Sequence, residues 1–291
     1  MGAFLQILMS GVTVGAMYAL IGLGFSMIYN TSEVINFAQG EFVMVGGMAA
    51  VSLHEVAHFP LSLAVLGAMG ITVLVAVLVE KLAIEPVRNS RLTTLIIITI
   101  GVSIIIRGLV EVVLGKDFHR LPPFSRDTLI PVGGAQIEPQ VLWIVGSLIV
   151  VMLALGWFFN HTRLGKAMLA TSQNRMAAEL MGINVKSILM LSFALSALLG
   201  AVAGVLTAPI TMTKYDIGIM LGLKGFCAAV IGGLGTAAGA FAGGLLLGIT
   251  ESLAAGYISS GYKDAVAFVI ILAVLFFVPS GLFGRREGKR V

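Results

Sequence analysis

The sequence has few charged residues and almost no cysteine. Only 11% of its 291 residues are charged, whereas a soluble domain carries about 25%. There is too little polar surface here to cover a globule in water, so the composition excludes a water-soluble fold. The single cysteine, Cys227, cannot form an internal disulfide and gives no indication of the redox compartment.

A nucleotide-binding loop is also missing, because the pattern G-x-x-x-x-G-K-[ST] does not occur. We therefore expect no ATPase site, no cofactor and no enzymatic activity in this chain, and any energy from ATP must come from a partner. The formal net charge of +4 is small, and the cations lie between apolar runs. That distribution is typical of membrane loops and gives no reason to expect nucleic acid as a partner.

Hydrophobic residues make up 58% of the chain and gather in long runs. A helix needs about 20 apolar residues to cross the hydrocarbon layer of a bilayer. Runs of that length or nearly so are 4–29, 34–53, 61–80, 93–115, 140–160, 187–208, 217–233, 236–256 and 264–283. The sequence predicts an all-α polytopic membrane protein, one transmembrane domain over residues 1–291, with eight or nine transmembrane helices and lipid around it.

The run 34–53 differs from the others because polar residues lie at its start. Asn36, Gln39 and Glu41 precede two adjacent glycines. Polar groups at membrane depth are tolerated only beside protein or a water-filled cavity, and an ionisable residue there is a functional candidate. We expect a broken or re-entrant element here, with Asn36, Gln39 and Glu41 lining a substrate pathway.

The cations predict the orientation. Segments 81–91, 161–186 and the tail residues Arg285, Arg286, Lys289 and Arg290 are separated by even numbers of apolar runs, so all three can share the cytoplasmic side. The loop 116–138 also carries cations, including Arg126, yet parity places it outside. If all nine runs span the membrane, the N-terminus lies outside too.

Glycines and intramembrane charges predict contacts between helices. The 36 glycines recur at a spacing of four, as in Gly11/Gly15, Gly200/Gly204, Gly235/Gly239/Gly243 and Gly244/Gly248. That spacing leaves one helix face bare, so backbones can approach closely in lipid. Among the charges, Arg107 and Glu111 are predicted to pair one turn apart, and Lys224 and Glu251 to pair across consecutive runs.

One motif raises an enzymatic alternative. His54-Glu55-Val56-Ala57-His58 matches the H-E-x-x-H signature of zinc proteases, in which two histidines one turn apart hold the metal and the glutamate acts as general base. Pro60 follows closely, so the motif lies at a helix end near the interface. The further glycine and histidine of the longer signature are missing. We favour an interfacial polar cap and expect no metal site, and we keep an intramembrane zinc protease as the alternative.

The polar segment 161–186 lies on the predicted cytoplasmic side. Ser172 suits an N-cap and Gly182 the left-handed position that ends a helix. Met176, Leu180 and Met181 give this short helix an apolar stripe. A helix of this kind, parallel to the membrane, is able to seat in a groove of another protein.

These segments resemble the LivH-type permeases of branched-chain amino-acid ABC importers. The resemblance rests on G-x-x-x-G-A-M-Y-A-L at 11–20, V-I-N-F-A-Q-G-E at 34–41, A-A-E-L-M-G-I-N at 177–184 and G-F-C-A-A-V-I-G-G-L-G at 225–235. It extends over nearly the whole chain. In one respect the chain departs from the wider importer pattern, which has glutamate before the two alanines, where Met176 stands here.

The resemblance implies a bacterial inner-membrane permease subunit for leucine, isoleucine and valine. It implies three kinds of partner: a second related permease, two cytoplasmic ATP-binding subunits and an extracytoplasmic binding protein. Segment 161–186 would couple to the ATPases through Asn174, Arg175, Ala177, Ala178, Glu179, Leu180 and Gly182. Two further alternatives stay open, namely an importer of the same type for urea, amides or other amino acids, and a secondary transporter.

Overall fold

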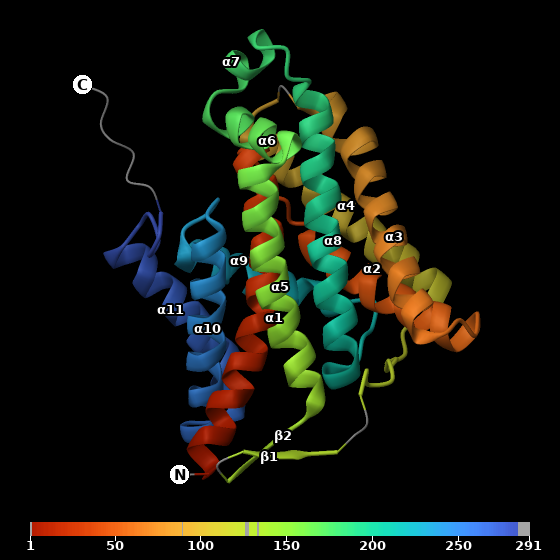
Figure 1. Cartoon of the computed structure of the whole chain (residues 1–291), viewed down its shortest axis with the longest axis vertical. Coiled ribbons are helices and arrows are strands. Elements are labelled where there is room, and N and C mark those ends of the chain that lie inside the picture. The colour runs from red at the N-terminus through yellow and green to blue at the C-terminus, as the bar shows by residue number, and fades with distance from the viewer. Residues whose placement is uncertain (1, 89, 126–127, 133, 285–291) are drawn as a thin grey trace.

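A computed structural model gives the fold and describes residues 2–88, 90–125, 128–132 and 134–284. Helices dominate it (Figure 1). Those long enough to cross a membrane are α1 (Gly2–Ser32), α3 (Leu61–Val79) with its extension to Val87, α4 (Leu92–Leu114), α5 (Pro139–His161), α8 (Val185–Thr211), α10 (Ala237–Tyr257) and α11 (Lys263–Phe277) with the 3-10 turn Ser260–Tyr262 before it. The extension of α3 is a π-helical turn, Glu80–Ile84, and a 3-10 turn, Glu85–Val87. Within the described residues there are seven such helices, as an all-α polytopic membrane protein requires.

Two of the predicted runs form shorter helices. Helix α2 (Gln39–Val51) has 13 residues and continues into a π-helical turn, Ser52–Val56, and α9 (Ile217–Gly232) has 16 residues. At 1.5 Å per residue they are about 20 and 24 Å long, less than the roughly 30 Å of a bilayer core. The run 34–53 is indeed broken, because residues 33–38 are not helical. Among the described residues, the expected eight or nine spans are thus seven long helices and two short ones.

A small β-hairpin lies at the same end of the molecule as the start of α1, and it was not predicted from the sequence. Strands β1 (Ile130–Val132) and β2 (Ala135–Ile137) pair antiparallel. The side chain of Gln6 in α1 donates to the backbone carbonyl of Gln136 at 3.0 Å and accepts from its backbone N–H at 2.9 Å. Helices α6 (Arg163–Gln173) and α7 (Arg175–Leu180) lie at the opposite end (Figure 1).

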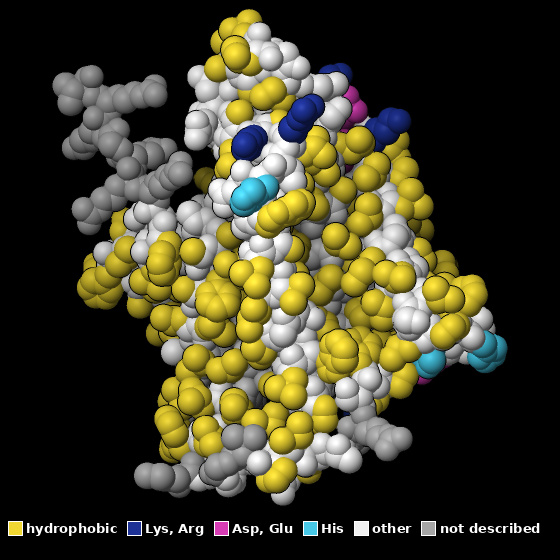
Figure 2. Space-filling model, in the orientation of Figure 1, with side chains coloured by type: hydrophobic (Ala, Val, Ile, Leu, Met, Phe, Trp, Pro, Cys, Tyr) yellow, Lys and Arg dark blue, Asp and Glu magenta, His cyan; other side chains and the backbone are white. Residues whose placement is uncertain are grey.

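The charge distribution agrees with the predicted orientation. Lys and Arg side chains gather at the end that carries α6 and α7, and the flank between the two ends is mainly hydrophobic (Figure 2). An ion pair of 3.2 Å between Lys186 and Glu85 joins the two cation-rich segments 81–91 and 161–186. The positive-inside rule predicts that this end is cytoplasmic, and hence that the hairpin and the start of α1 face outside. Arg126 and the tail cations, Arg285, Arg286, Lys289 and Arg290, lie outside the described residues.

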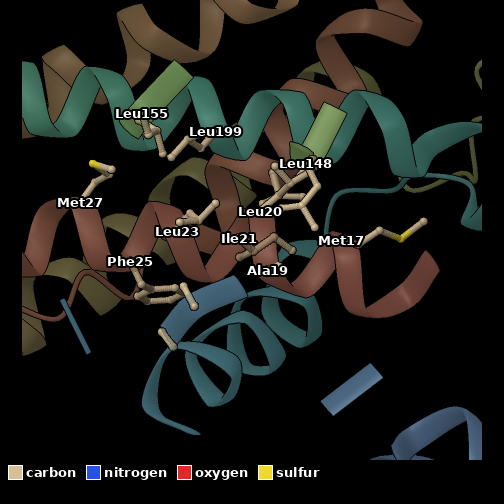
Figure 3. Packing of buried hydrophobic residues seen from close by; sticks show 14 of the residues in the cluster. Met17, Ala19, Leu20, Ile21, Leu23, Phe25, Met27, Leu148, Leu155 and Leu199 are labelled. Carbon is tan, nitrogen blue, oxygen red and sulfur yellow. The ribbon is translucent and has the colours of Figure 1, made fainter. Parts of the chain in front are cut away.

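Helix α1 forms the centre of the bundle. It is buried without interruption from Gly15 to Ile28, and Leu20 and Leu23 belong to a cluster with side chains of α5 and α8 (Figure 3). The outer helices expose large apolar side chains instead, among them Leu66, Ile105 and Phe276, which are 64%, 61% and 82% exposed. Soluble monomers do not expose apolar surface on this scale, so this outer layer is the lipid-facing surface.

Bare glycine faces allow the helices to approach this closely, as the spacing of four predicts. A methyl group added at Gly11 or Gly15 of α1 would lie 2.8 Å from the Cα of Ile249 or Leu245 in α10. From the other side, a methyl group at Gly248 would overlap the backbone of Gly15. Without a hydrophobic driving force between helices in lipid, such van der Waals contact is a main source of association.

The α1–α10 contact yields a stability prediction. Gly248→Ala is expected to lower the free energy of unfolding by about 1–3 kcal/mol, because the new methyl group has only backbone atoms to displace. Thermal unfolding in detergent measures the change. Gly146→Ala in α5 is the matched control, since its methyl group would meet no heavy atom within 4 Å. Equal melting temperatures for the two variants would contradict this account of the packing.

Candidate functional site

The cytoplasmic segment between α5 and α8 folds into two helices rather than one. Ser172 was the predicted N-cap, but it lies in the last turn of α6, where its hydroxyl donates to the Leu169 carbonyl at 2.8 Å. The N-cap of α7 is Asn174, whose Oδ1 accepts from the Ala177 N–H at 2.9 Å. Asparagine is as good an N-cap as serine, and Ser172 is not available because it is part of the preceding helix α6.

The end of α7 agrees with the prediction for Gly182. This residue has φ +85°, a left-handed conformation that glycine adopts without steric cost. The N–H of Ile183 donates to the Ala178 carbonyl and that of Gly182 donates to the Glu179 carbonyl, both at 3.0 Å. These two hydrogen bonds form a Schellman motif. Helix α7 is therefore fixed at both ends although it is only six residues long.

Helix α7 presents a hydrophobic ridge to the outside of the molecule. Met176, Leu180 and Met181 are 74%, 84% and 84% exposed. On its opposite face Ala178 is buried and packs with Val185 and Leu189 of α8. Large apolar side chains at this exposure, at the polar end of a membrane protein, are suited to a protein partner.

The broken segment 33–38 returns from the cytoplasmic end of α1 into the bundle, where α2 begins. The polar side chains of Asn36 and Gln39, 1% and 0% exposed, support the backbone there. Oδ1 of Asn36 accepts from the Ala38 N–H at 3.1 Å, and Nε2 of Gln39 donates to the Ser196 carbonyl in α8 at 3.1 Å. Asn36 and Gln39 therefore hold the break together, and their role in a substrate pathway stays a prediction.

Glu41 is placed differently, at the wall of a cavity of about 180 Å³. Its side chain is 1% exposed. Oε1 accepts from the hydroxyl of Ser103 in α4 at 2.8 Å, whereas Oε2 is buried with no hydrogen-bond partner among the described residues. The remaining lining residues come from α1, segment 33–38, α4 and α9 and include Phe25, Phe37, Arg107, Gly218, Gly222 and Phe226.

The sequence reasoning missed Ser103 and misassigned Arg107. The expected Arg107–Glu111 pair does not form, because Glu111 pairs with Lys116 at 2.9 Å. That hydrogen bond with the carboxylate raises the pKa of Lys116 above its usual value. Arg107 lines the cavity with Glu41 instead. The sequence contained a sign that Ser103 and Arg107 lie together, because they are one helical turn apart in a mainly apolar run and so share a helix face.

The structure does not bring His54, Glu55 and His58 together as a zinc site. Ser52–Val56 is a π-helical turn and His58 lies beyond it with φ +55°, so the two histidines do not share an α-helical face. Nδ1 of His54 is 2.9 Å from the Phe59 carbonyl oxygen. Within the described part of the chain no three His, Cys, Asp or Glu residues are grouped for a metal ion. The geometry favours the interfacial cap and gives the zinc-protease alternative no support.

The predicted pair Lys224–Glu251 is confirmed and belongs to a larger cluster. Nζ of Lys224 in α9 lies 2.7 Å from Oε1 of Glu251 in α10 and 2.6 Å from Oδ1 of Asp264 in α11. The hydroxyl of Tyr18 in α1 donates to Oε2 of Glu251 at 3.0 Å. Four helices thus meet at one cation, and both charged side chains of the Lys224–Glu251 pair are 7% exposed.

The chain matches proteins of one family over almost its full length. Residues 7–275 match the family described as branched-chain amino acid transport system, permease component. The high-affinity branched-chain amino acid transport system permease protein LivH of Salmonella typhimurium is 37% identical, over 99% of this chain and 98% of its own. BraD of Pseudomonas aeruginosa, which carries the same description, is 34% identical over the same shares. PsaBC from Streptococcus pneumoniae, solved in complex with a Fab, has a similar fold, with a TM-score of 0.54 at 14% identity over 96% of this chain and 93% of its own.

The cluster around Lys224 yields a second stability prediction. Lys224→Met is expected to destabilise the fold by about 3–5 kcal/mol, because Glu251 would be left buried without its cation. Lys224→Met/Glu251→Met should recover part of that loss. Lys116→Met is the control, since its partner Glu111 is 32% exposed and so keeps contact with solvent when the cation is removed. Thermal unfolding of the four proteins measures these effects, and a double variant no more stable than the single one would contradict the pairing argument.

Proposed function

This chain belongs to the family of branched-chain amino acid transport permease components, and on that premise we propose that it forms part of the membrane pathway of an ATP-driven importer of leucine, isoleucine and valine. The observation that carries the proposal is the family match from residue 7 to residue 275. The chain is a multi-pass protein of the bacterial inner membrane. Its sequence has no P-loop, so ATP is hydrolysed by partner subunits.

The assembly that we infer has this subunit beside a second, related permease. Two cytoplasmic ATP-binding subunits lie beneath the pair, and an extracytoplasmic binding protein delivers the amino acid. The exposed ridge of α7 supports a contact with the ATPases, because it is apolar and lies at the cytoplasmic end. The broad apolar flank is suited to lipid and to the second permease.

Helix α7 is the proposed coupling element, with Asn174, Arg175, Ala177, Ala178, Glu179, Leu180 and Gly182 as its residues. A push on α7 would reach α8 through Ala178, which packs on Val185 and Leu189. From α8 it would reach α2, because Gln39 is hydrogen-bonded to Ser196. A rigid helix linking two such contacts is the kind of element that moves as a body between two states.

The two short helices, α2 and α9, are the proposed moving parts of the pathway, and counting them gives nine membrane segments. Their glycine faces touch, since a methyl group at Gly222 would lie 2.9 Å from the Cα of Gly40. Each follows a non-helical stretch, residues 33–38 and 212–216. Non-helical backbone at membrane depth is tolerated where it is buried in protein or lines a cavity.

The function is tested by transport in proteoliposomes that contain the whole assembly and its binding protein. We expect uptake of labelled leucine that requires ATP hydrolysis. Uptake of urea but not of leucine would assign the pathway to another small solute. Leucine uptake driven by an ion gradient in the absence of the ATPase subunits would establish a secondary transporter and contradict the proposal.

The coupling role of α7 is tested by Gly182→Val. A β-branched residue at φ +85° carries strain of about 1–3 kcal/mol, enough to unwind so short a helix, although its side chain would have free space. We expect membrane insertion and basal ATP hydrolysis to persist. ATP-driven leucine uptake should fall about tenfold, because a strain of about 1.4 kcal/mol corresponds to a factor of ten.

Gly115→Val is the matched control for this variant. Gly115 also has a positive φ, +84°, also has no neighbour within 4 Å of an added methyl group, and ends α4 on the outer side. Gly182→Asn is the rescue variant, because asparagine tolerates the left-handed conformation. Full ATP-driven uptake by Gly182→Val, or equal losses in Gly115→Val, would exclude α7 as the coupling element.

A further inference from the structure

The cavity beside Glu41 has an unusual combination of walls. The lining combines a buried carboxylate, a guanidinium and the Ser103 hydroxyl with aromatic rings, the aliphatic side chains of Ile100, Ile219 and Leu223, and bare glycine backbone. The rings of Phe25 and Phe37 each lie against that of Phe226, with centroids 5.7 and 5.9 Å apart. Gly218 and Gly222 of α9 have no side chains, so part of the wall that α9 forms is bare backbone. A volume of about 180 Å³ is the share of about six liquid water molecules, room for one small solute.

The charges on these walls are opposite but not joined. Among the described residues, Glu41 and Arg107 do not form an ion pair with each other. Oε2 of Glu41 is left without a partner although it is buried. A buried carboxylate oxygen is costly unless a donor, best a cation, reaches it. The unsatisfied oxygen therefore indicates a missing donor in this cavity.

The position of the cavity suits a solute that arrives from outside. Arg107 lies 15 residues along α4 from Leu92, about 22 Å from the cytoplasmic end of that helix, and hence in the outer half of the membrane. The cavity wall also includes α2 and α9, the two short helices with touching glycine faces.

We propose that this cavity is a transit site for a zwitterionic α-amino acid with an apolar side chain. Glu41 receives the ammonium group, Arg107 receives the carboxylate, and the side chain lies against Phe25, Phe37 and Phe226. Ser103 positions the Glu41 carboxylate through its hydrogen bond to Oε1. The proposal rests on the proposed function, since it names where in the pathway the amino acid is held. On this proposal, the subunit would discriminate against solutes that lack either charge.

The first test is uptake by Glu41→Gln in the assembled transporter with its binding protein. The amide keeps an oxygen for Ser103 but loses the charge, so the fold is retained. We expect leucine uptake to fall about ten- to hundredfold, the effect of losing a charge-assisted hydrogen bond, with ATP hydrolysis persisting. Arg107→Gln should behave alike. Glu111→Gln, the same change on the same helix as Arg107 but outside the cavity, should transport as the wild type does.

The second test detects occupancy directly. In a Cys227→Ala background, the thiol of Ser103→Cys is modified with a small methanethiosulfonate reagent while the assembly is held open to the outside. Leucine delivered by the binding protein should slow the modification, and Glu41→Gln should abolish that protection. A thiol at Lys116→Cys, outside the cavity, should be modified equally with and without leucine.

The outcomes separate this site from the function itself. Failure of the wild-type assembly to import leucine would refute the proposed function. Import by the wild type, together with full uptake by Glu41→Gln or with no protection of Ser103→Cys by leucine, would refute the transit site alone. Protection by sodium or potassium chloride in place of leucine would assign the cavity to an inorganic cation and overturn the proposal.

Discussion

Backbone N–H and C=O groups in lipid have no water to bond, and this constraint decides where the chain departs from a helix. Segment 33–38 departs from a helix deep in the bundle, and hydrogen bonds of three side chains hold it and the start of α2 in place. Asn36 bonds within the segment, Thr99 of α4 accepts from the Phe37 N–H at 3.2 Å, and Gln39 reaches Ser196 of α8. Helices α4 and α8 therefore stabilise this non-helical segment. The segment and the start of α2 form part of the wall of the cavity that contains the unpaired Glu41 carboxylate.

Much of the fold could be predicted because hydropathy is a local signal. The long apolar runs, the glycine spacing and the Lys224–Glu251 pair all follow from residues in the same run or in consecutive runs of the sequence. The break before α2 was also visible, since polar residues inside an apolar run need a buried or wet environment. The hairpin was not, because strands of three residues are set by their contact with Gln6 rather than by their own pattern.

The candidate site was harder to predict because it depends on which helix faces lie together. Glu41 was identified from its own run, but its partner Ser103 lies 62 residues away. Arg107 was assigned to Glu111 by helical spacing, yet the long side chain of Lys116 reaches Glu111 from beyond the helix end. Similarly, Ser172 and Asn174 are both good N-caps, and only the extent of α6 decides between them.

Helix α8 connects the hydrophobic ridge of α7 with the helix α2 that carries Glu41 of the cavity. Helix α8 contacts α7 at its cytoplasmic start and α2 near its middle, and Gly204 of α8 lies directly against the backbone of α2. Contacts between backbones do not deform gradually, because no side chain is present to yield. Under the proposed function, a displacement of α8 would therefore be passed directly to α2 rather than absorbed in between.

The cluster around Lys224 also bears on how the chain is made. Glu251 is synthesised 27 residues after Lys224. At about 5–20 residues per second, the ribosome adds Glu251 roughly one to five seconds after Lys224. A lone lysine at the centre of a membrane helix costs about 2.5–3.5 kcal/mol on insertion. Helix α9 is short and bears that cost until Glu251 of α10 reaches Lys224. We therefore expect the last quarter of the chain to settle in the membrane as a group rather than helix by helix.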